Sequence, residues 1–161
     1  MLAPLPTMRR LRVFSFDPVQ GRSLEGASTA VICVSIPWSD GDGAGLQAGP
    51  VGEYLEVVDV DPAAQCVYPP VNLNDPHLLA QDGMPPSEGH PWFHQQMVYA
   101  VAMKTIEQFE GALGRRSLWS PRFVKTANGG IDSQYVPRLR IYPHALAEAN
   151  AYYDPERKAL L

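Results

Sequence analysis

The stretch Pro91-Trp-Phe-His-Gln-Gln-Met-Val-Tyr-Ala-Val-Ala-Met-Lys-Thr-Ile-Glu-Gln-Phe-Glu-Gly-Ala-Leu113 decides the fold, because its spacing is that of one long helix. Pro91 suits the first turn, where its missing N–H is not needed, and Gly111 and Gly114 supply a stop. The second half carries one apolar face, formed by Val98, Tyr99, Ala102, Met103, Ile106, Phe109 and Leu113. The first half is also apolar on the opposite side, through Phe93, Met97, Ala100 and Val101. We therefore expect a helix that is covered all round at its start and half-exposed at its end, with a sheet packed on it.

Four segments outside this helix have the composition of strands: 11–16, 29–36, 53–60 and 138–142. The second is almost continuously apolar and β-branched, which predicts a strand buried on both faces. Between them, residues 63–89 are rich in Pro, Asn, Asp and Gly and predict an ordered surface excursion, held by Tyr68, Val71, Leu73 and Leu78. The fold class expected is α+β, a twisted mixed or antiparallel sheet packed on one long helix, with extensive Pro-rich loops.

The rest of the C-terminal third predicts a loop over 120–130, a helical turn over 143–149 and a terminal β-hairpin. Tyr152 and Tyr153 favour a strand, Asp154-Pro155 starts a turn, and residues 158–161 begin a second strand that stops mid-run. Such an incomplete hairpin would leave backbone groups unpaired. We therefore expect residues 1–161 to be a single, incomplete N-terminal domain of a longer protein.

Composition excludes several classes of function. A net charge of -4 with scattered Lys and Arg disfavours nucleic-acid binding and an anionic membrane as partner. Pro4 and Pro6 interrupt the apolar segment that a signal peptide needs, and no run approaches a membrane span, so we expect a cytoplasmic protein. Cys33 and Cys66 lie in apolar, strand-like settings, which favours two reduced, buried thiols over a disulfide.

Three sets of residues are candidates for chemistry, and each has a simpler interpretation. His90 and His94 have the spacing of a metal-binding pair, but His90 precedes a proline, so a cap residue and a partly buried histidine are favoured. Asp40 and Asp42 alternate with glycines as in some calcium loops, but the other ligands are missing and a solvated turn is favoured. Paired carboxylates such as Asp59 and Asp61 are more often solvated than catalytic at a strand end.

The C-terminal segment from Arg138 to Leu161 resembles bacterial proteins related to the thermolysin-like zinc metallopeptidases, or gluzincins. Its specific motif, Asn150-Ala-Tyr-Tyr153, is similar to an Asn-Ala-aromatic-aromatic edge strand that lies along the substrate cleft of that family. The segments 10–18 and 93–103 also resemble the front half of such proteins. In the family, a partner strand follows the motif, and then a helix that carries His-Glu-x-x-His.

This resemblance implies substrate-binding roles for Asn150, Ala151 and Tyr152. Asn150 would hydrogen-bond a peptide backbone through its side-chain amide, and Ala151 would offer backbone groups to an extended peptide, as in strand addition. The alternative is that Asn150 only opens a strand and that the two tyrosines alternate between core and surface.

The chain departs from the family in one respect that concerns activity. No His-Glu-x-x-His occurs in the 161 residues, so nothing in them would activate a zinc-bound water. We expect no catalytic residue, metal ligand or cofactor in this chain, zinc being implied only for the full-length family. Retention of stoichiometric zinc after dialysis, or chelator-sensitive cleavage of casein, would contradict this expectation.

Three hypotheses of function arise from these observations. The preferred one is the N-terminal portion of a zinc metallopeptidase-like hydrolase, which forms one wall of a peptide-binding cleft without being catalytic itself. The alternative is a non-enzymatic module that binds a peptide or protein through the terminal edge strand. The third is a structural subdomain whose partner is a missing C-terminal half.

Overall fold

The computed structural model describes residues 7–19, 30–38, 45–148 and 150–161 of the chain. The elements follow in the order β1 (Met8–Phe14), β2 (Val31–Pro37), β3 (Leu55–Val57), β4 (Val60–Asp61), β5 (Cys66–Val67), α1 (Pro76–Ala80), α2 (Pro91–Leu113), β6 (Arg122–Lys125), β7 (Ile131–Gln134), β8 (Leu139–Ile141), β9 (Tyr153–Asp154) and β10 (Ala159–Leu160). The class is α+β with one long helix, as the sequence predicts. The expected segment 53–60 contains two strands, β3 and β4. Asp40 and Asp42 lie outside the described residues.

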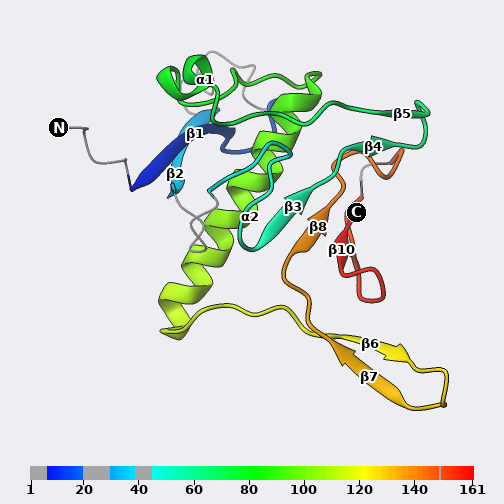
Figure 1. Ribbon diagram of the computed structural model, residues 1–161. Coiled ribbons are helices and arrows are strands. Elements are labelled where there is room, and N and C mark those ends of the chain that lie inside the picture. The colour runs from blue at the N-terminus through cyan, green and yellow to red at the C-terminus, as the bar shows by residue number, and fades with distance from the viewer. Residues whose placement is uncertain (1–6, 20–29, 39–44, 149) are drawn as a thin grey trace.

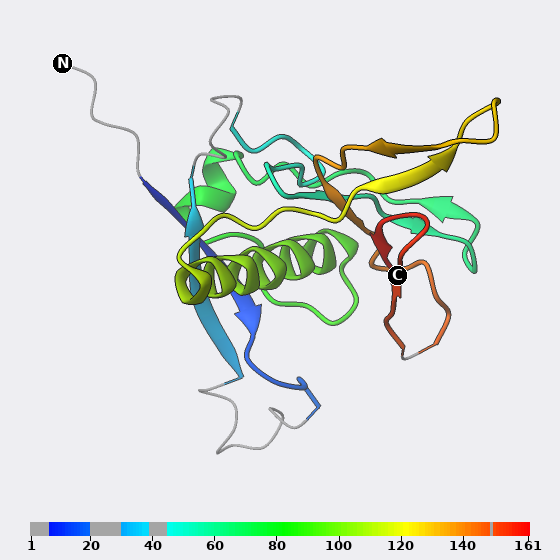
Figure 2. The same cartoon turned by 90° about the horizontal axis from the view of Figure 1, so that it is seen from below.

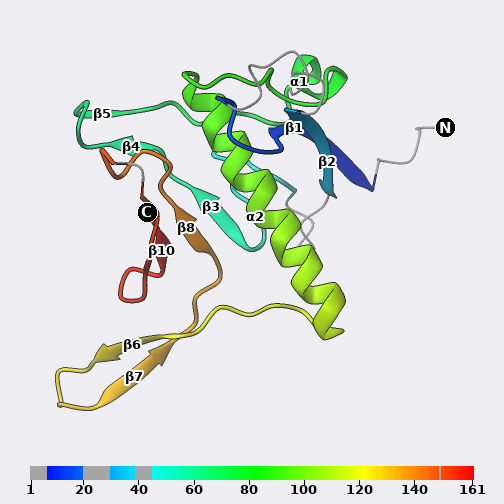
Figure 3. The same cartoon turned by 180° about the vertical axis from the view of Figure 1, so that it is seen from behind.

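The strands form several small sheets around α2 (Figure 1). β1 and β2 make an antiparallel ribbon, and β3, β8, β10 and β9 make a mixed sheet in that order. Within this sheet, β8 is parallel to both β3 and β10, whereas β9 and β10 form the antiparallel terminal hairpin. Seen from behind, α2 runs between the ribbon and the mixed sheet (Figure 3). The helix packs on β1, β2 and β3.

Local signals set both ends of α2, which begins and ends as the sequence predicts. The side chain of His90 caps the helix by accepting a hydrogen bond from the Trp92 N–H, which confirms the interpretation of His90 as a cap residue. Gly114 closes the helix in the left-handed conformation, with φ 65°. Buried residues concentrate in the first half, but this half is not covered all round as expected, since Val101 is 44% exposed. Phe109 and Leu113 also do not reach the core, being 61% and 53% exposed, because the sheets do not extend to the last turns.

Two adjacent buried glutamines hold three other segments against α2. Gln95 donates to the Asp59 carboxylate and the Pro69 carbonyl, and accepts from the Val71 N–H at 2.8 Å. This places Val71, and with it Leu73, in the core, so the excursion over 63–89 is ordered as expected. Because the amide of Gln95 makes every hydrogen bond that its two N–H groups allow, its burial carries no unpaired donor.

Gln96, the next residue of the helix, makes equivalent hydrogen bonds to other segments. It accepts from the Met84 N–H at 2.7 Å and donates to the Arg12 carbonyl at 2.9 Å and to the Met84 carbonyl. Gly83, with φ 87°, lies so close to this amide that a Cβ at position 83 would collide with it. The glutamine therefore joins β1 and the loop before α2 to the helix.

Four expectations on the remaining elements are wrong. β2 is not buried on both faces: Val31, 36% exposed, and the exposed Cys33 lie on the face opposite the buried Ile36, because only one face of a two-stranded ribbon meets α2. The two cysteines are not buried thiols as expected, since Cys33 is exposed and Cys66 is half-buried; neither forms a disulfide. The segment 120–130 is not only a loop, since it contributes β6 to a hairpin, and 143–148 is a hydrogen-bonded turn rather than a helical one.

The second strand of the terminal hairpin also differs from the expectation of unpaired backbone groups. β10 pairs with β8 on one side and β9 on the other, and the Leu161 N–H donates to the Tyr152 carbonyl at 3.0 Å. The outer position of the sheet belongs to β9.

Replacing Gln96 by Met should lower the free energy of unfolding by roughly 2–4 kcal/mol, because buried backbone groups of Arg12 and Met84 lose their partner. Urea denaturation measures the change. Gln108→Met, on the exposed side of the same helix, is the matched control and should shift stability by less than about 0.5 kcal/mol. Equal losses in the two variants would contradict the role of Gln96.

Candidate functional site

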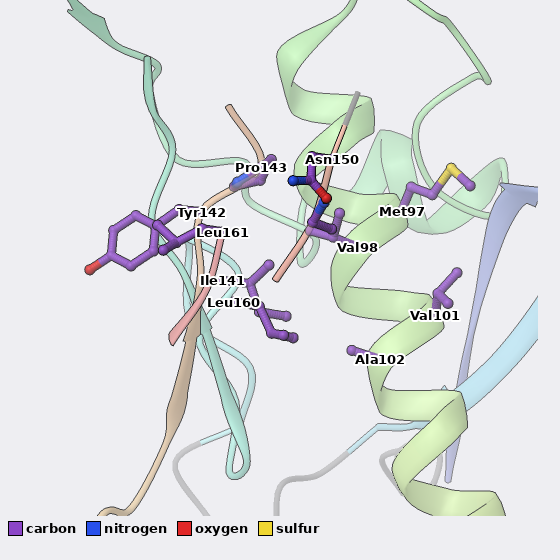
Figure 4. Close-up of a pocket in the computed structure, with 11 residues that line it drawn as sticks. Met97, Val98, Val101, Ala102, Ile141, Tyr142, Pro143, Asn150, Leu160 and Leu161 are labelled. Atoms are coloured by element: carbon purple, nitrogen blue, oxygen red, sulfur yellow. The ribbon is translucent and has the colours of Figure 1, made fainter. Parts of the chain in front are cut away.

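A largely apolar groove separates α2 from the mixed sheet. One cavity of about 370 Å³ lies toward the N-terminus of α2. A second cavity of about 470 Å³ adjoins it, and Ala102 and Leu160 line both. Figure 4 shows Ile141 and Leu160 extending from the strands toward the helix. We call these two cavities together the helix–sheet groove; its other lining residues include Val98, Tyr142, Asn150, Ala151, Tyr153 and Leu161.

The strand β9 runs along this groove with one edge open. Tyr152 forms a doubly hydrogen-bonded pair with Leu161, both bonds measuring 3.0 Å. Because inward and outward backbone groups alternate along an antiparallel strand, the N–H and C=O of Tyr153 point away from β10. In the described part of the chain no strand pairs with this outer edge. The edge is therefore available for an additional strand.

The three residues predicted to bind substrate lie together at this edge, but they differ in what they offer. Asn150 and Ala151 line the groove, and the Asn150 Oδ1 accepts from the Ala151 N–H at 2.9 Å, which leaves the amide NH₂ of Asn150 to donate. The backbone of Tyr152 is used by Leu161, so only its side chain, 47% exposed, is accessible.

Tyr153 is the residue that sequence reasoning missed. It combines an outward-facing backbone with a side chain that lines the groove. The alternation of the two tyrosines was visible in the sequence, but which of them faces outward depends on the register with β10.

A chain of hydrogen bonds links the N-terminal part of α2 to the turn after β8. The buried Asp59 Oδ1 lies 2.6 Å from His144 Nδ1, and His144 Nε2 lies 2.7 Å from His94 Nδ1. His94 Nε2 then meets the Glu88 carbonyl at 3.0 Å. His94 belongs to α2 and His144 to the turn after β8, so this chain joins the two walls of the groove.

Asp59 and the Glu88 carbonyl both accept hydrogen bonds, so the ring nitrogens at the two ends of this chain, His144 Nδ1 and His94 Nε2, are the donors. A charge on both rings at once would place two N–H groups face to face between His144 Nε2 and His94 Nδ1.

The surroundings of His94 favour its neutral form. Burial lowers the pKa of His94 below its usual value of 6.5, and the neighbouring His144 lowers it further. Desolvation and a like charge both disfavour the charged form.

The histidines do not fit a zinc site. Both nitrogens of His94 are engaged, by His144 and Glu88, and the Nδ1 of His90 caps α2. Among the described residues, no cluster of three or more His, Cys, Asp or Glu side chains could hold a metal ion. His90 and His94 therefore have structural partners in place of a shared ligand.

Comparisons with models of protein families, with curated proteins and with solved structures found no match. Separately, none of the helices described by the structure is long and apolar enough to cross a lipid bilayer.

The lowered pKa of His94 makes stability depend on pH. A base whose folded pKa lies below its unfolded value stabilises the fold above the unfolded pKa, and this stability is lost as the pH falls through the folded pKa. The free energy of unfolding should therefore decrease below about pH 6.5. Urea denaturation between pH 5 and 8 tests this, with His94→Gln flattening the profile and the exposed His77→Gln leaving it unchanged. An identical slope in all three proteins would contradict the assignment.

Proposed function

We propose that this chain binds an extended peptide along the outer edge of β9 and forms one wall of a peptide-binding cleft in a zinc metallopeptidase-related protein. The observation that carries the proposal is an open strand edge lying beside an apolar groove. Backbone hydrogen bonds along such an edge give affinity, and pockets for alternate side chains give selectivity. The resemblance of Asn150-Ala-Tyr-Tyr153 to a substrate-binding edge strand supports the same role.

The geometry also supports a peptide class. Every second side chain of an added strand would face the groove, because side chains alternate along a strand. The groove is lined by Val98, Ala102, Ile106 and Leu160, with the Asn150 amide among few polar groups. The preferred peptides should therefore carry apolar residues at alternate positions.

The alternative is a non-enzymatic module that binds a peptide or protein through the same edge. It is favoured by the presence of edge and groove within this one chain. The two functions differ in the fate of the bound peptide, because the first requires a partner segment, such as a C-terminal half, that supplies zinc and catalytic groups. A cytoplasmic location, expected from the sequence, belongs to both proposals.

The backbone of Tyr153 provides a direct test. Tyr153→Pro removes the outward N–H, and proline is tolerated on an edge strand, whereas Tyr153→Val removes the same ring but keeps the N–H. Peptide affinity, measured by fluorescence anisotropy with a labelled library of alternating apolar peptides, should be about tenfold weaker for Pro than for Val. Equal affinities would contradict strand addition, and a library without any binder would contradict both functions.

The side chain of Asn150 provides a second test. Asn150→Ala removes the amide that faces the groove and should weaken peptide binding by about three- to tenfold, the worth of one hydrogen bond. Asn128→Ala, in the exposed tip between β6 and β7, is the matched control and should bind normally. Normal binding by both variants would remove Asn150 from the site.

A further inference from the structure

A second pocket, of about 320 Å³, has a chemical character opposite to that of the groove. Its lining residues come from β3, from β8, from the β6–β7 hairpin and from the turn between β9 and β10, and Figures 1 and 2 show how these elements are arranged. Five cationic side chains line it, together with one carboxylate, Glu56: they are Arg122, Arg138, Arg140, Arg157 and Lys158. We call it the basic pocket. None of its lining residues lines the helix–sheet groove.

Two of the five cations have carboxylate partners. Arg140 Nε lies 3.1 Å from Glu56, and Arg157 Nε lies 3.6 Å from Asp154. These pairs neutralise part of the charge around the pocket.

The other three cations meet only neutral acceptors. Arg122 donates to the Arg157 carbonyl at 2.9 Å, Arg138 donates to the Gly52 carbonyl, and Lys158 lies 3.4 Å from Ser120 Oγ. Within the described ranges, no carboxylate forms an ion pair with any of these three residues. Three positive charges of the pocket are therefore without a carboxylate partner among the described residues.

The burial of Lys158 is the strongest indication of a bound anion, since only 9% of the residue is exposed. The side chain is therefore largely removed from water, and its ammonium group meets a hydroxyl at 3.4 Å, which is a weak substitute for the hydration that it loses. This local excess of positive charge occurs in a chain whose net charge is -4. A general cationic composition therefore does not account for it.

We propose that the basic pocket binds a phosphate-bearing ligand, with a diphosphate group facing Arg122, Arg138 and Lys158. A diphosphate carries about three negative charges near neutral pH, which matches the three cations that have no carboxylate partner in the described part of the chain. Arginine forks bind phosphate oxygens in pairs, and lysine adds a compact charge. The volume lies at the lower end of the range of small-molecule sites, about 300–1,000 Å³, and suits a group of this size.

The inference of a diphosphate site does not depend on the peptide-binding proposal, because the basic pocket and the helix–sheet groove share no lining residue. Calorimetric titration of the protein with inorganic pyrophosphate tests the inference directly. Saturable one-to-one binding is expected, and it should weaken as NaCl is raised, because part of the attraction is between solvent-exposed charges. ADP in a parallel titration shows whether a nucleoside diphosphate is bound as well as the inorganic group; either result keeps the diphosphate site.

Matched variants identify the site. Arg122→Gln and Lys158→Gln should each weaken pyrophosphate binding at least about tenfold, which is the loss of one strong charged contact. Arg115→Gln changes the net charge equally at an exposed position outside the pocket and should bind like the unmodified protein. Since Lys158 is buried, circular dichroism checks the fold of its variant, and the exposed Arg122 variant serves if the Lys158 variant unfolds.

Three results would overturn the inference. The first is the absence of saturable pyrophosphate binding. The second is an equal loss of affinity in Arg115→Gln, which would show that only net charge matters. The third is tighter binding of a tetraglutamate peptide than of pyrophosphate, which would assign the pocket to an acidic segment of a protein.

Discussion

The buried carboxylate of Asp59 is the interaction on which the arrangement of this fold depends. Asp59 lies between β3 and β4, and only 4% of it is exposed, so the expectation of a solvated carboxylate at this strand end is wrong. It accepts from Gln95 of α2 at 2.8 Å and from His144, in the turn after β8, at 2.6 Å. Its own carbonyl accepts from the Tyr68 N–H at 2.9 Å. One residue thus connects the helix, the sheet and the Pro-rich excursion, and its buried carboxyl group is tolerated because Gln95 and His144 hydrogen-bond to it.

The same interaction explains why a groove exists. The sheet is held to α2 at the end where His94 and His144 meet, and through β3 along the side. The strands β10 and β9 lie farther from this attachment, and apolar cavities remain between them and the helix. An open edge next to an apolar groove is therefore a consequence of where the polar contacts lie, and not of a missing core.

The sequence predicted what local chemistry determines. The caps His90 and Gly114 and the apolar spacing gave the bounds of α2, and Asp154-Pro155 gave the terminal hairpin. It failed where tertiary position decides, as for the exposed Val31 of β2. Asp59 and His144 are 85 residues apart, and no periodicity relates them. The sequence likewise does not decide which of Tyr152 and Tyr153 has its backbone facing outward, because only pairing with β10 fixes the register.

The terminal hairpin contributes to both surfaces that the structure distinguishes. Residues at its turn, Arg157 and Lys158, line the basic pocket, while Leu160 and Tyr153 line the groove. β10 follows directly after Lys158 and lies between β8 and β9. The position of the open edge of β9 therefore depends on β10. A ligand that binds only the folded hairpin stabilises that fold by mass action. An anion bound at Lys158 would then also stabilise the strand edge. The anion would contact Lys158, β9 pairs with β10, and both Lys158 and β10 belong to one four-residue segment, 158–161.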